Sequence, residues 1–486
     1  MQRLLIDAHA LAARWWDEEE ALLMAPAGRH DREVVQRGVV GLLPPTVWWA
    51  YGLLCRGDDG DRVTALRALR SVVDRQYDVP GRDWHGSWPS TSREPTPEPG
   101  SVAFEDHDPN GRVLVGVALA LVLRDHALPE ELAGDLRTAV VRAVHAEPVG
   151  RVDASWTNIA AQLAWLELEA ARWLDDVGLL ARGWSRARAV VADSSHRGHV
   201  AEHVSPTYTG LTMMALSLWA DRPPLQELAE LGRVLRDEVW HDLLAAWHPG
   251  LGTLVPPFTR AFGMDLREHV GAVAPWLAWL VDGAWPFPVL DADVLHQGHH
   301  LALTFVVDGI AGAGEDVMAM APLVRAQPAR QGSWTDEIGP RRWSGWTGAT
   351  LAVGAESSGV DWDGWWQVPT AAAIWRAPDG SNAWLRLHQD GGPVEAHVAS
   401  DGRRVSLVHA VAEGRSLRLV LGGGTAPAVV DGELRHGGRR WRLAGVGPLG
   451  LLQDVRGDTT RTVPDGTFEL CLTTPGSMVT LSTLVG

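Results

Sequence analysis

The strongest constraint on the fold is a succession of apolar segments with helical spacing that fills the first 290 residues. Apolar side chains recur about every 3.6 residues, which is typical of amphipathic helices packed on a core. The segments are 2–24, 32–55, 61–76, 112–126, 129–146, 155–176, 178–193, 206–220, 223–247 and 269–284. Short breaks rich in Pro, Gly and Asp separate them, so consecutive segments are expected to form antiparallel hairpins. We expect residues 1–290 to form an (α/α) toroid of about ten to twelve helices.

The sequence pattern changes after residue 290, from long helical segments to short apolar runs divided by turn residues. Asp379-Gly380, Asp401-Gly402 and Asp431-Gly432 are dipeptides that favour tight β-hairpin turns. Residues 291–486 are therefore expected to form an antiparallel β-sandwich domain. The predicted fold class is α+β and multidomain, with the toroid as the catalytic domain and the sandwich following it.

Charge and residue usage exclude several classes of function. The formal net charge is −17, so nucleic acid and membrane are not expected as partners, because binding to phosphate groups requires a basic surface. All 43 positions that hold Lys or Arg hold Arg, which excludes mechanisms built on a Schiff-base lysine or a P-loop lysine. Cys55 and Cys471 are too few for a disulfide framework or a cysteine-based zinc site.

No stretch of the sequence has the character of a signal peptide or a membrane span. The N-terminal segment is interrupted by Asp7, His9 and Arg14, whereas a signal peptide has an uninterrupted apolar core. No apolar run free of charges reaches the roughly 18 residues that a membrane helix needs. A cytoplasmic location is therefore predicted, and nothing in the sequence indicates an oligomeric state.

A proline-rich loop, residues 78–111, interrupts the series of helical segments. A loop this long inside a compact domain is typically a lid or a binding loop, and this one carries aromatic and imidazole side chains. His107, near its end, is predicted to take part in catalysis. The predicted substrate-binding residues of the loop are Trp84, His85, Trp88, Asp106 and Asn110.

Two helix starts after the loop present polar side chains. Asn158 lies in the first turn of the segment 155–176, where Asn is unfavourable by propensity. His203 precedes and Tyr208 follows the helix start at Ser205-Pro206. In a toroid, these starts meet at one opening, so Asn158, His203 and Tyr208 are the predicted catalytic residues. The further predicted substrate-binding residues are Trp156, Glu202 and, from the Trp- and Arg-rich stretch 332–346, Arg341.

An amide, an imidazole and a phenol at one opening suit β-elimination from a uronic-acid polysaccharide. Asn or His can neutralise the sugar carboxylate by hydrogen bonding, while Tyr or His can remove the C5 proton and protonate the leaving oxygen. The reaction requires no metal, so no cofactor is predicted. The expected partner is an acidic oligosaccharide or another small-molecule substrate.

This combination of architecture and residues resembles the chondroitin/hyaluronan, alginate and heparinase II/III families of polysaccharide lyases. The resemblance rests on Asn158 in SWTNIA, on His203 and on Tyr208. It implies that they act as the carboxylate-neutralising Asn, the neutralising or basic His, and the acid/base Tyr. The segment QGHHLALTF is similar to the His-Gly-His-Ala-Asp segment that begins the heparinase-like β domain. It has Gln297 in place of the first His and His300-Leu301 in place of Ala-Asp.

Other functions are compatible with the same residues. A glycoside hydrolase would use paired carboxylates. The candidates for such a pair are Asp106, Asp108, Glu202, Asp336 and Glu337. A terpene-cyclase-like α-barrel would surround a carbocation with Trp, and a non-catalytic carbohydrate-binding protein would stack some of the 25 tryptophans on sugars. The candidates for metal binding, spaced as in zinc sites, are His296, His299 and His300.

Overall fold

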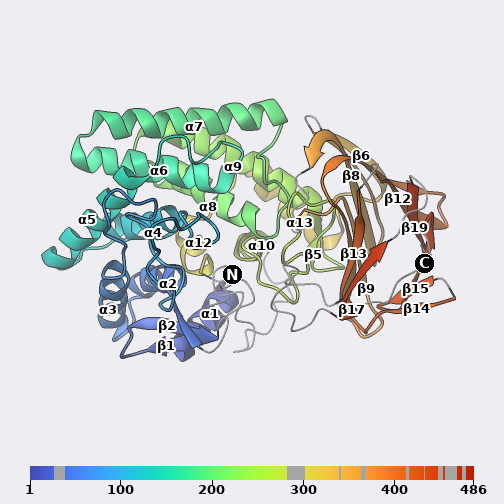
Figure 1. Cartoon of the computed structure of the whole chain (residues 1–486), viewed down its shortest axis with the longest axis horizontal. Helices are drawn as coiled ribbons and strands as arrows, with labels where there is room; N and C mark the ends of the chain where they lie inside the picture. Colours follow the sequence, from blue (N-terminus) through green and yellow to red (C-terminus); the bar gives the residue numbers. More distant parts are fainter. Residues whose placement is uncertain are drawn as a thin grey trace.

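A computed structural model of the protein has an α+β fold in which a helical part is followed by a large antiparallel sheet (Figure 1). The predicted α+β class is thereby confirmed. The two parts lie side by side along the long axis of the molecule (Figure 1). The structure describes residues 1–26, 39–281, 302–338, 341–362, 368–411, 415–431, 433–446, 453–454, 468–472 and 478–485.

Consecutive helices of the N-terminal part pack against each other in pairs, as the short breaks in the sequence predict. The pairs are α2 (Leu43–Arg56) with α3 (Asp61–Val73), α4 (Gly111–Asp125) with α5 (Glu130–Ala146), α6 (Thr157–Leu174) with α7 (Val177–Arg197), and α8 (Tyr208–Asp221) with α9 (Gln226–Ala246). Helices α2, α4, α6 and α8 also contact one another in that order. A further helix, α12 (Thr304–Ile310), contacts both α8 and α2.

Burial divides these helices into an inner and an outer layer. Along α6 every residue from Thr157 to Ala171 is buried, and α4 and α8 are buried along most of their length. The outer helix α7 instead buries a stripe that includes Leu179, Ala187 and Val190. A helix that is apolar all round must be covered on all sides, whereas an amphipathic helix covers it and keeps a polar face in water.

The first predicted helix, 2–24, is wrong in its length. Helix α1 ends at Trp15, and the chain enters a three-stranded antiparallel sheet of β1 (Trp16–Asp17), β2 (Leu22–Pro26) and β3 (Val39–Leu42). The helix is broken at Asp17, whose carboxylate accepts hydrogen bonds from the backbone N–H groups of Glu19 (2.9 Å) and Glu20 (2.8 Å). Such a side-chain bond to the following backbone is typical of a turn.

Two other boundaries also differ from the prediction. Helix α2 begins at Leu43 rather than at residue 32, because a helix tolerates Pro44-Pro45 only in its first turn. At the other end of the helical part, α10 (Ala274–Val281) is followed by α12 and by α13 (Glu315–Ala326), so helices continue beyond residue 290. The first strand of the large sheet begins at Gly332.

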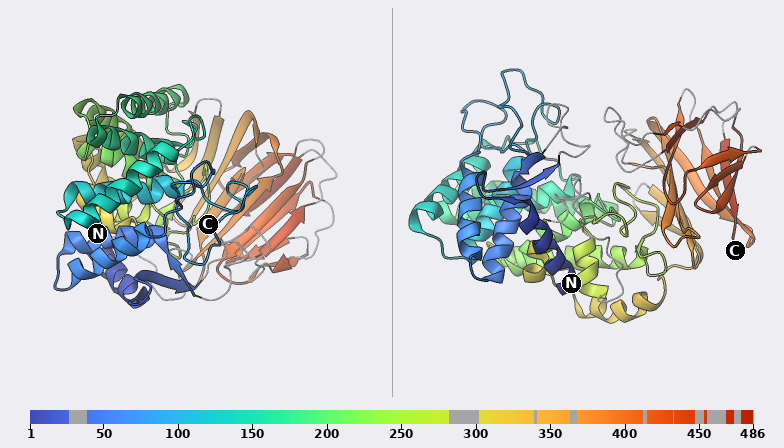
Figure 2. Two further views of the ribbon diagram at one scale, coloured as in Figure 1. Left: turned by 60° about the vertical axis from the view of Figure 1, so that its left-hand side comes forward. Right: turned by 90° about the horizontal axis from the view of Figure 1, so that it is seen from below.

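The C-terminal part contains, among the described residues, a 14-stranded sheet in which every pair is antiparallel. Its strands are β6 (Gly332–Ile338), β7 (Arg341–Thr347), β8 (Leu351–Trp362), β9 (Ala371–Arg376), β10 (Asn382–Gln389), β11 (Gly392–Ser400), β12 (Arg404–Ala410), β13 (Leu417–Gly423), β14 (Ala428–Val430), β15 (Glu433–His436), β16 (Arg439–Ala444), β17 (Gln453–Asp454), β18 (Phe468–Leu472) and β19 (Met478–Leu484). The spatial order is β14-β15-β16-β19-β12-β11-β8-β9-β10-β13-β18-β17, with β7 between β6 and β8. The sheet curls back on itself and is sandwich-like (Figure 2).

Strand β9 shows how the sheet joins the two parts. Ala371, Ala373 and Trp375 belong to a core enclosed by the curled sheet, while Ala372 and Ile374 belong to the core of the helical part. Successive side chains point to opposite faces of a strand, so a strand buried on both faces needs a continuous apolar run. At β9 the sheet is therefore covered by the helical part on one face and by its own curled half on the other.

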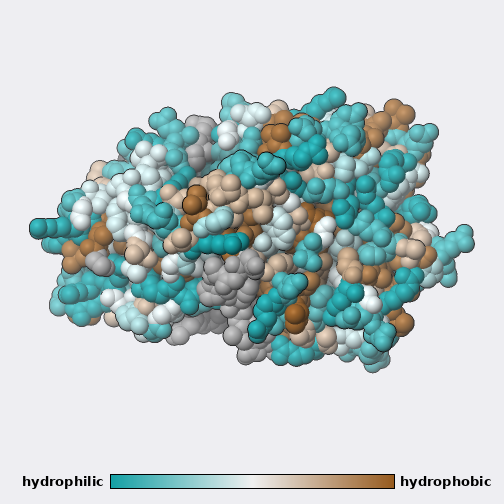
Figure 3. Space-filling view, turned by 180° about the vertical axis from the view of Figure 1, so that it is seen from behind, coloured by the Kyte–Doolittle hydropathy of each residue, from teal (hydrophilic) through white to brown (hydrophobic). Residues whose placement is uncertain are grey.

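In the part of the chain that the structure describes, no helix is both long enough and apolar enough to cross a membrane. Seen from behind, hydrophobic residues lie in separate patches among hydrophilic ones (Figure 3).

Candidate functional site

A buried amide–carboxylate pair joins the start of α6 to the turn before α8. The backbone N–H of Asn158 donates to one carboxylate oxygen of Glu202 (3.2 Å), and the Asn158 side-chain amide donates to the same oxygen. Only 4% of Asn158 and 6% of Glu202 are exposed. Burial raises the pKa of Glu202, while the hydrogen bonds from Asn158 and the charge of Arg260 oppose the increase. The Asn158 amide is thus already hydrogen-bonded to a carboxylate of the protein itself.

His203 follows Glu202 and lies between a second histidine and a tryptophan of the sheet. Its ring stacks on Trp343 of β7 with a centroid separation of 4.3 Å and an interplanar angle of 13°, and the ring centroid of His199 is 4.1 Å away. Its Nδ1 has no hydrogen-bond partner among the described residues. Burial holds the pKa of His203 well below its usual range, and the charges of nearby basic side chains lower it further. The imidazole is therefore neutral and brings no positive charge to a carboxylate.

Tyr208, the first residue of α8, is half-buried, unlike Glu202 and His203. Its backbone N–H donates to Ser205 Oγ (3.1 Å), which is the expected contact of a capping serine. The guanidinium carbon of Arg260 lies 5.5 Å from the centre of the Tyr208 ring, within the range of a cation–π contact. Since the charge of Arg260 also acts on Glu202, these three side chains form one electrostatic cluster.

The sheet contributes a second buried carboxylate beside the His203 stack. Trp343 Nε1 donates to Glu356 (2.9 Å), and the guanidinium of Arg341 lies 3.5 Å from the same carboxylate. Trp343 and Glu356 face each other across β7 and β8. Burial raises the pKa of Glu356, and the charge of Arg341 opposes the increase. Arg341 therefore stands on the sheet side of the cluster, next to the aromatic ring that covers His203.

The aromatic and imidazole residues of the long loop mostly hold the loop itself in place. Trp84 and Trp88 are buried, and Trp88 Nε1 donates to a backbone carbonyl of α3 (3.0 Å). His107 is buried and packs edge-on against Trp84 at 5.8 Å. His85 Nδ1 accepts a hydrogen bond from a backbone N–H of the same loop (3.1 Å). Buried rings of this kind offer no open face to a substrate.

The end of the loop approaches the cluster through one aromatic contact. Phe104 packs edge-on against Trp156, with ring centroids 6.0 Å apart, and 38% of Trp156 is exposed. Trp156 immediately precedes α6, two residues before Asn158. Asp106 accepts a hydrogen bond from a loop N–H (2.7 Å) and Asn110 accepts one from Arg151 (2.9 Å). Of the predicted sugar-stacking residues, Trp156 is the one with an exposed ring beside the cluster.

The predicted metal candidates, His296, His299 and His300, lie outside the described residues. Within the described ranges, no group of three or more His, Cys, Asp or Glu side chains is placed to hold a metal ion.

Four residues of this region were not predicted from the sequence: Arg260, Trp343, His199 and Glu356. Arg260 lies in an irregular segment between β5 (Thr253–Leu254) and α10, where no periodicity marks a functional position. Trp343 belongs to a stretch that is rich in Trp and Arg, but only the three-dimensional packing selects it from its neighbours. His199 precedes His203 by four residues, and this spacing is the one signal that could have found it.

A carboxyl group beside Arg330 gives the protein a predictable pH dependence. Burial raises the pKa of Asp242, on α9, to about 7, with Arg330 opposing the increase and Glu238 adding to it. A carboxyl whose pKa is higher in the folded than in the unfolded chain binds its proton more tightly when folded. The free energy of unfolding therefore falls as the pH rises from about 4 to about 7. We expect Asp242→Asn to remove this contribution, which is at most about 1.4 kcal/mol per pH unit.

Urea denaturation of the wild type and of Asp242→Asn at about pH 4.5, 6 and 8 checks this expectation. The variant should gain stability relative to the wild type as the pH rises, with the smallest difference at the acid end. Parallel pH profiles for the two proteins would contradict the assigned role of Asp242.

The fold and the cluster define a two-part α+β protein in which a buried carboxylate, amide and imidazole and a half-buried phenol lie where the helices join the sheet. The chain belongs to the family described as "Domain of unknown function (DUF8769)", which matches residues 2–302. The matched range includes Asn158, Glu202, His203, Tyr208 and Arg260, whereas Arg341 and Trp343 lie beyond it.

Comparisons with individual proteins do not extend the family assignment. No curated protein matches the sequence. The chain is similar at 12% identity to native alpha-2-macroglobulin from Escherichia coli, spanning domain MG7 to the C-terminus, over 91% of this chain and 67% of that chain, with a TM-score of 0.26. A mutant of Salmonella alpha-2-macroglobulin is 12% identical over 99% of this chain and 28% of that chain, with a TM-score of 0.27. Likenesses at these TM-scores carry no argument about function.

Proposed function

We propose that the protein is a carbon–oxygen lyase that cleaves uronic-acid oligosaccharides by β-elimination. The observation that carries the proposal is the position of Tyr208, half-buried over Arg260, whose charge also acts on Glu202 of the Asn158–Glu202 pair. The reaction needs a proton-transferring group close to a positive charge that stabilises the carboxylate as the C5 proton leaves. Tyr208 and Arg260 meet these two requirements with side chains that lie within cation–π range of each other.

The proposed roles follow the charges of the cluster. Arg260 pairs with the uronate carboxylate and stabilises the negative charge that develops on it. Tyr208 carries both proton transfers: its phenolate removes the C5 proton, and the hydroxyl so formed protonates the leaving oxygen as the C4–O bond breaks and a C4–C5 double bond forms. His203 is buried between His199 and Trp343 with a lowered pKa, so no proton transfer is assigned to it. Asn158 acts indirectly, because its amide holds the Glu202 carboxylate in place. In the role predicted from the sequence, Asn158 would instead contact the substrate carboxylate directly.

Substrate binding in this proposal uses the rim of the cluster. Trp156 stacks on a sugar ring with its exposed indole face, and Arg341 attracts the acidic oligosaccharide from the sheet side. The contacts that link α2, α4, α6, α8 and α12 in a cycle support a toroid whose inner helices surround the site.

A glycoside hydrolase is the second candidate, and the raised pKa of Glu202 is the observation that favours it. A buried carboxyl with a raised pKa is suited to protonate a glycosidic oxygen. The second carboxylate of such an enzyme would come from the loop or from the sheet side, where Glu356 lies buried beside Arg341.

The two reactions differ in their products. The purified protein is incubated with oligosaccharides of galacturonate, alginate and glycosaminoglycans, and both ultraviolet absorbance and new reducing ends are followed. Elimination creates an unsaturated uronide, so absorbance and reducing ends should rise together. New reducing ends without absorbance would replace the lyase by the hydrolase, and intact substrates throughout would contradict both.

A further inference from the structure

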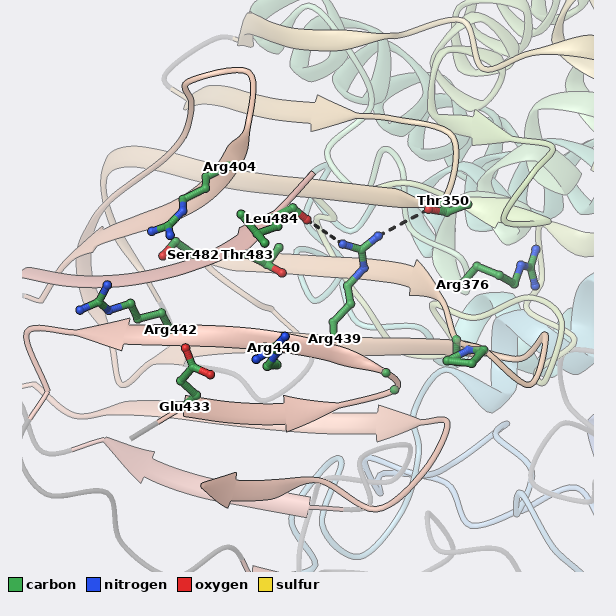
Figure 4. Close-up of a pocket in the computed structure, with 14 residues that line it drawn as sticks. Thr350, Arg376, Arg404, Glu433, Arg439, Arg440, Arg442, Ser482, Thr483 and Leu484 are labelled. Carbon is green, nitrogen blue, oxygen red and sulfur yellow. Dashed lines mark hydrogen bonds between the residues drawn. The ribbon is translucent and has the colours of Figure 1, made fainter. Parts of the chain in front are cut away.

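A groove lined by arginines lies on the sheet part, away in sequence from the cluster around Glu202. It encloses about 580 Å³, which is the size of a small-molecule site. Figure 4 shows its lining side chains, with Arg376 near one end and Arg442 near the other. The arginines that line it are Arg376, Arg404, Arg439, Arg440 and Arg442.

The register of the strands places a further arginine, Arg435, beside one of the groove arginines. Arg440 and Arg442 flank the buried Trp441 on β16, and both are exposed on the face opposite to it. Across the strand pair β15–β16, Arg440 lies directly opposite Arg435. Like charges at directly opposed positions destabilise a sheet, so this arrangement has an electrostatic cost that a bound anion would offset.

Arg439 adds a partly buried charge to the same groove. Its guanidinium donates to the backbone carbonyl of Leu484 (2.9 Å) and to Thr350 Oγ1 (3.4 Å), and its Nε is buried with no partner among the described residues. Burial lowers the pKa of Arg439. A guanidinium that is desolvated with only neutral partners gains most from an added anion.

Acidic side chains do not balance these charges. Glu433 is the acidic residue that lines the groove, opposite Arg442 on β15, and Asp401 lies in the turn before Arg404. Within the described part of the chain, no ion pair at 4.0 Å or less joins a carboxylate to any of the five groove arginines. The groove is thus a positive region on a chain whose formal net charge is −17.

We propose that this groove binds an anionic ligand that carries at least two oxyanion groups. Arginine binds carboxylate, sulfate and phosphate through paired N–H groups, and the positive groups are distributed along the groove rather than gathered at one point (Figure 4). Ser482, between β12 and β16, offers a hydroxyl beside Arg442 for the uncharged part of the ligand. This site is independent of the proposed lyase activity, because it shares no residue with the cluster around Glu202.

Isothermal titration calorimetry of the full chain tests the proposal with two probes, inorganic tripolyphosphate and a tetrasaccharide of galacturonic acid. At least one probe should bind, and its affinity should fall as salt is added. The double variant Arg440→Gln/Arg442→Gln should weaken this binding at least about tenfold, because it removes two charge-assisted contacts. Both positions are exposed, so the thermal unfolding midpoint should stay close to that of the wild type.

The matched control is Arg137→Gln/Arg188→Gln, which removes the same charge from exposed positions on α5 and α7. This control should bind the probe as the wild type does. Tighter binding of the tetrasaccharide would assign an acidic carbohydrate as the ligand, and tighter binding of tripolyphosphate would assign a phosphate-bearing one. The proposal is overturned if neither probe binds at millimolar concentration, or if the control loses as much affinity as the groove variant.

Discussion

Replacement of Glu167 by alanine is expected to lower the free energy of unfolding by about 3–5 kcal/mol. Glu167 lies on the inner helix α6 and is fully buried. It accepts hydrogen bonds from Arg182 (2.7 and 3.1 Å) and from Arg186 (3.2 Å), both on α7. The substitution leaves two guanidinium groups facing a buried surface without their counter-charge, which costs far more than the loss of an exposed ion pair.

The same arginines tie the helix pair to its surroundings. Arg182 also donates to the backbone carbonyl of Val144 on α5 (2.8 Å), and Arg186 donates to that of Val152 (3.2 Å). Loss of Glu167 therefore loosens contacts that reach the connection between α5 and α6, next to the start of the helix that carries Asn158. We expect the variant to unfold at lower urea concentration with a similar dependence on denaturant.

Urea denaturation followed by circular dichroism measures this effect, with Glu131→Ala as the matched control. Glu131 is an exposed residue in the first turn of α5, and its replacement should change the free energy of unfolding by less than about 1 kcal/mol. A change below 1 kcal/mol for Glu167→Ala as well would show that Arg182 and Arg186 find other partners.

The sequence predicts the helices well where their apolar pattern is long and local. The segments 112–126, 129–146 and 206–220 correspond to α4, α5 and α8 within two residues at each end. Each of these helices follows from contacts between residues three or four positions apart, which the sequence displays directly. The pairing of consecutive helices follows from the short connections between them.

The N-terminal sheet and the roles of the loop residues depend on distant contacts, so the sequence does not reveal them. Leu22 and Leu23 continue the apolar pattern of the preceding helix, yet they form β2 because the turn at Asp17 returns the chain to pair with Trp16. Trp88 looks like a residue that could stack on a sugar, yet its indole is buried and bonded to α3. In the sequence, an aromatic residue that stacks on a sugar cannot be distinguished from one that packs in the core.

The candidate site was predictable in its polar residues but not in their pairing. Asn158 stands out because an amide in the first turn of an apolar helix needs a partner. Which partner it has, Glu202, depends on how α6 packs beside the turn before α8. Arg260 reaches the site from an irregular segment, and no local rule connects it to Tyr208.

Tyr208→Phe is expected to reduce kcat for oligosaccharide cleavage by about 10²–10⁴-fold, the range that a positioned acid or base contributes. The substitution removes only the hydroxyl, so the ring still lies over Arg260 and the helix cap at Ser205 is unchanged. Since binding of the sugar carboxylate is assigned to Arg260, KM should change much less than kcat.

Arg260→Lys should instead raise KM as well as lower kcat, because a lysine lacks the paired N–H groups of a guanidinium.

Tyr51→Phe provides the matched control for the loss of a tyrosine hydroxyl. Tyr51 is buried on α2, where its hydroxyl donates to Asp125 (3.0 Å). Its replacement should lower stability by about 1–3 kcal/mol, since it leaves a carboxylate without that donor, and should leave kcat within a factor of about two. Steady-state kinetics on the best substrate of the oligosaccharide screen, together with thermal unfolding of all three variants, separate loss of catalysis from loss of stability.

If Tyr208→Phe keeps kcat within about tenfold of the wild type while Tyr51→Phe behaves as expected, Tyr208 is not the proton-transferring group. The raised pKa of Glu202 would then point to that carboxyl as the acid.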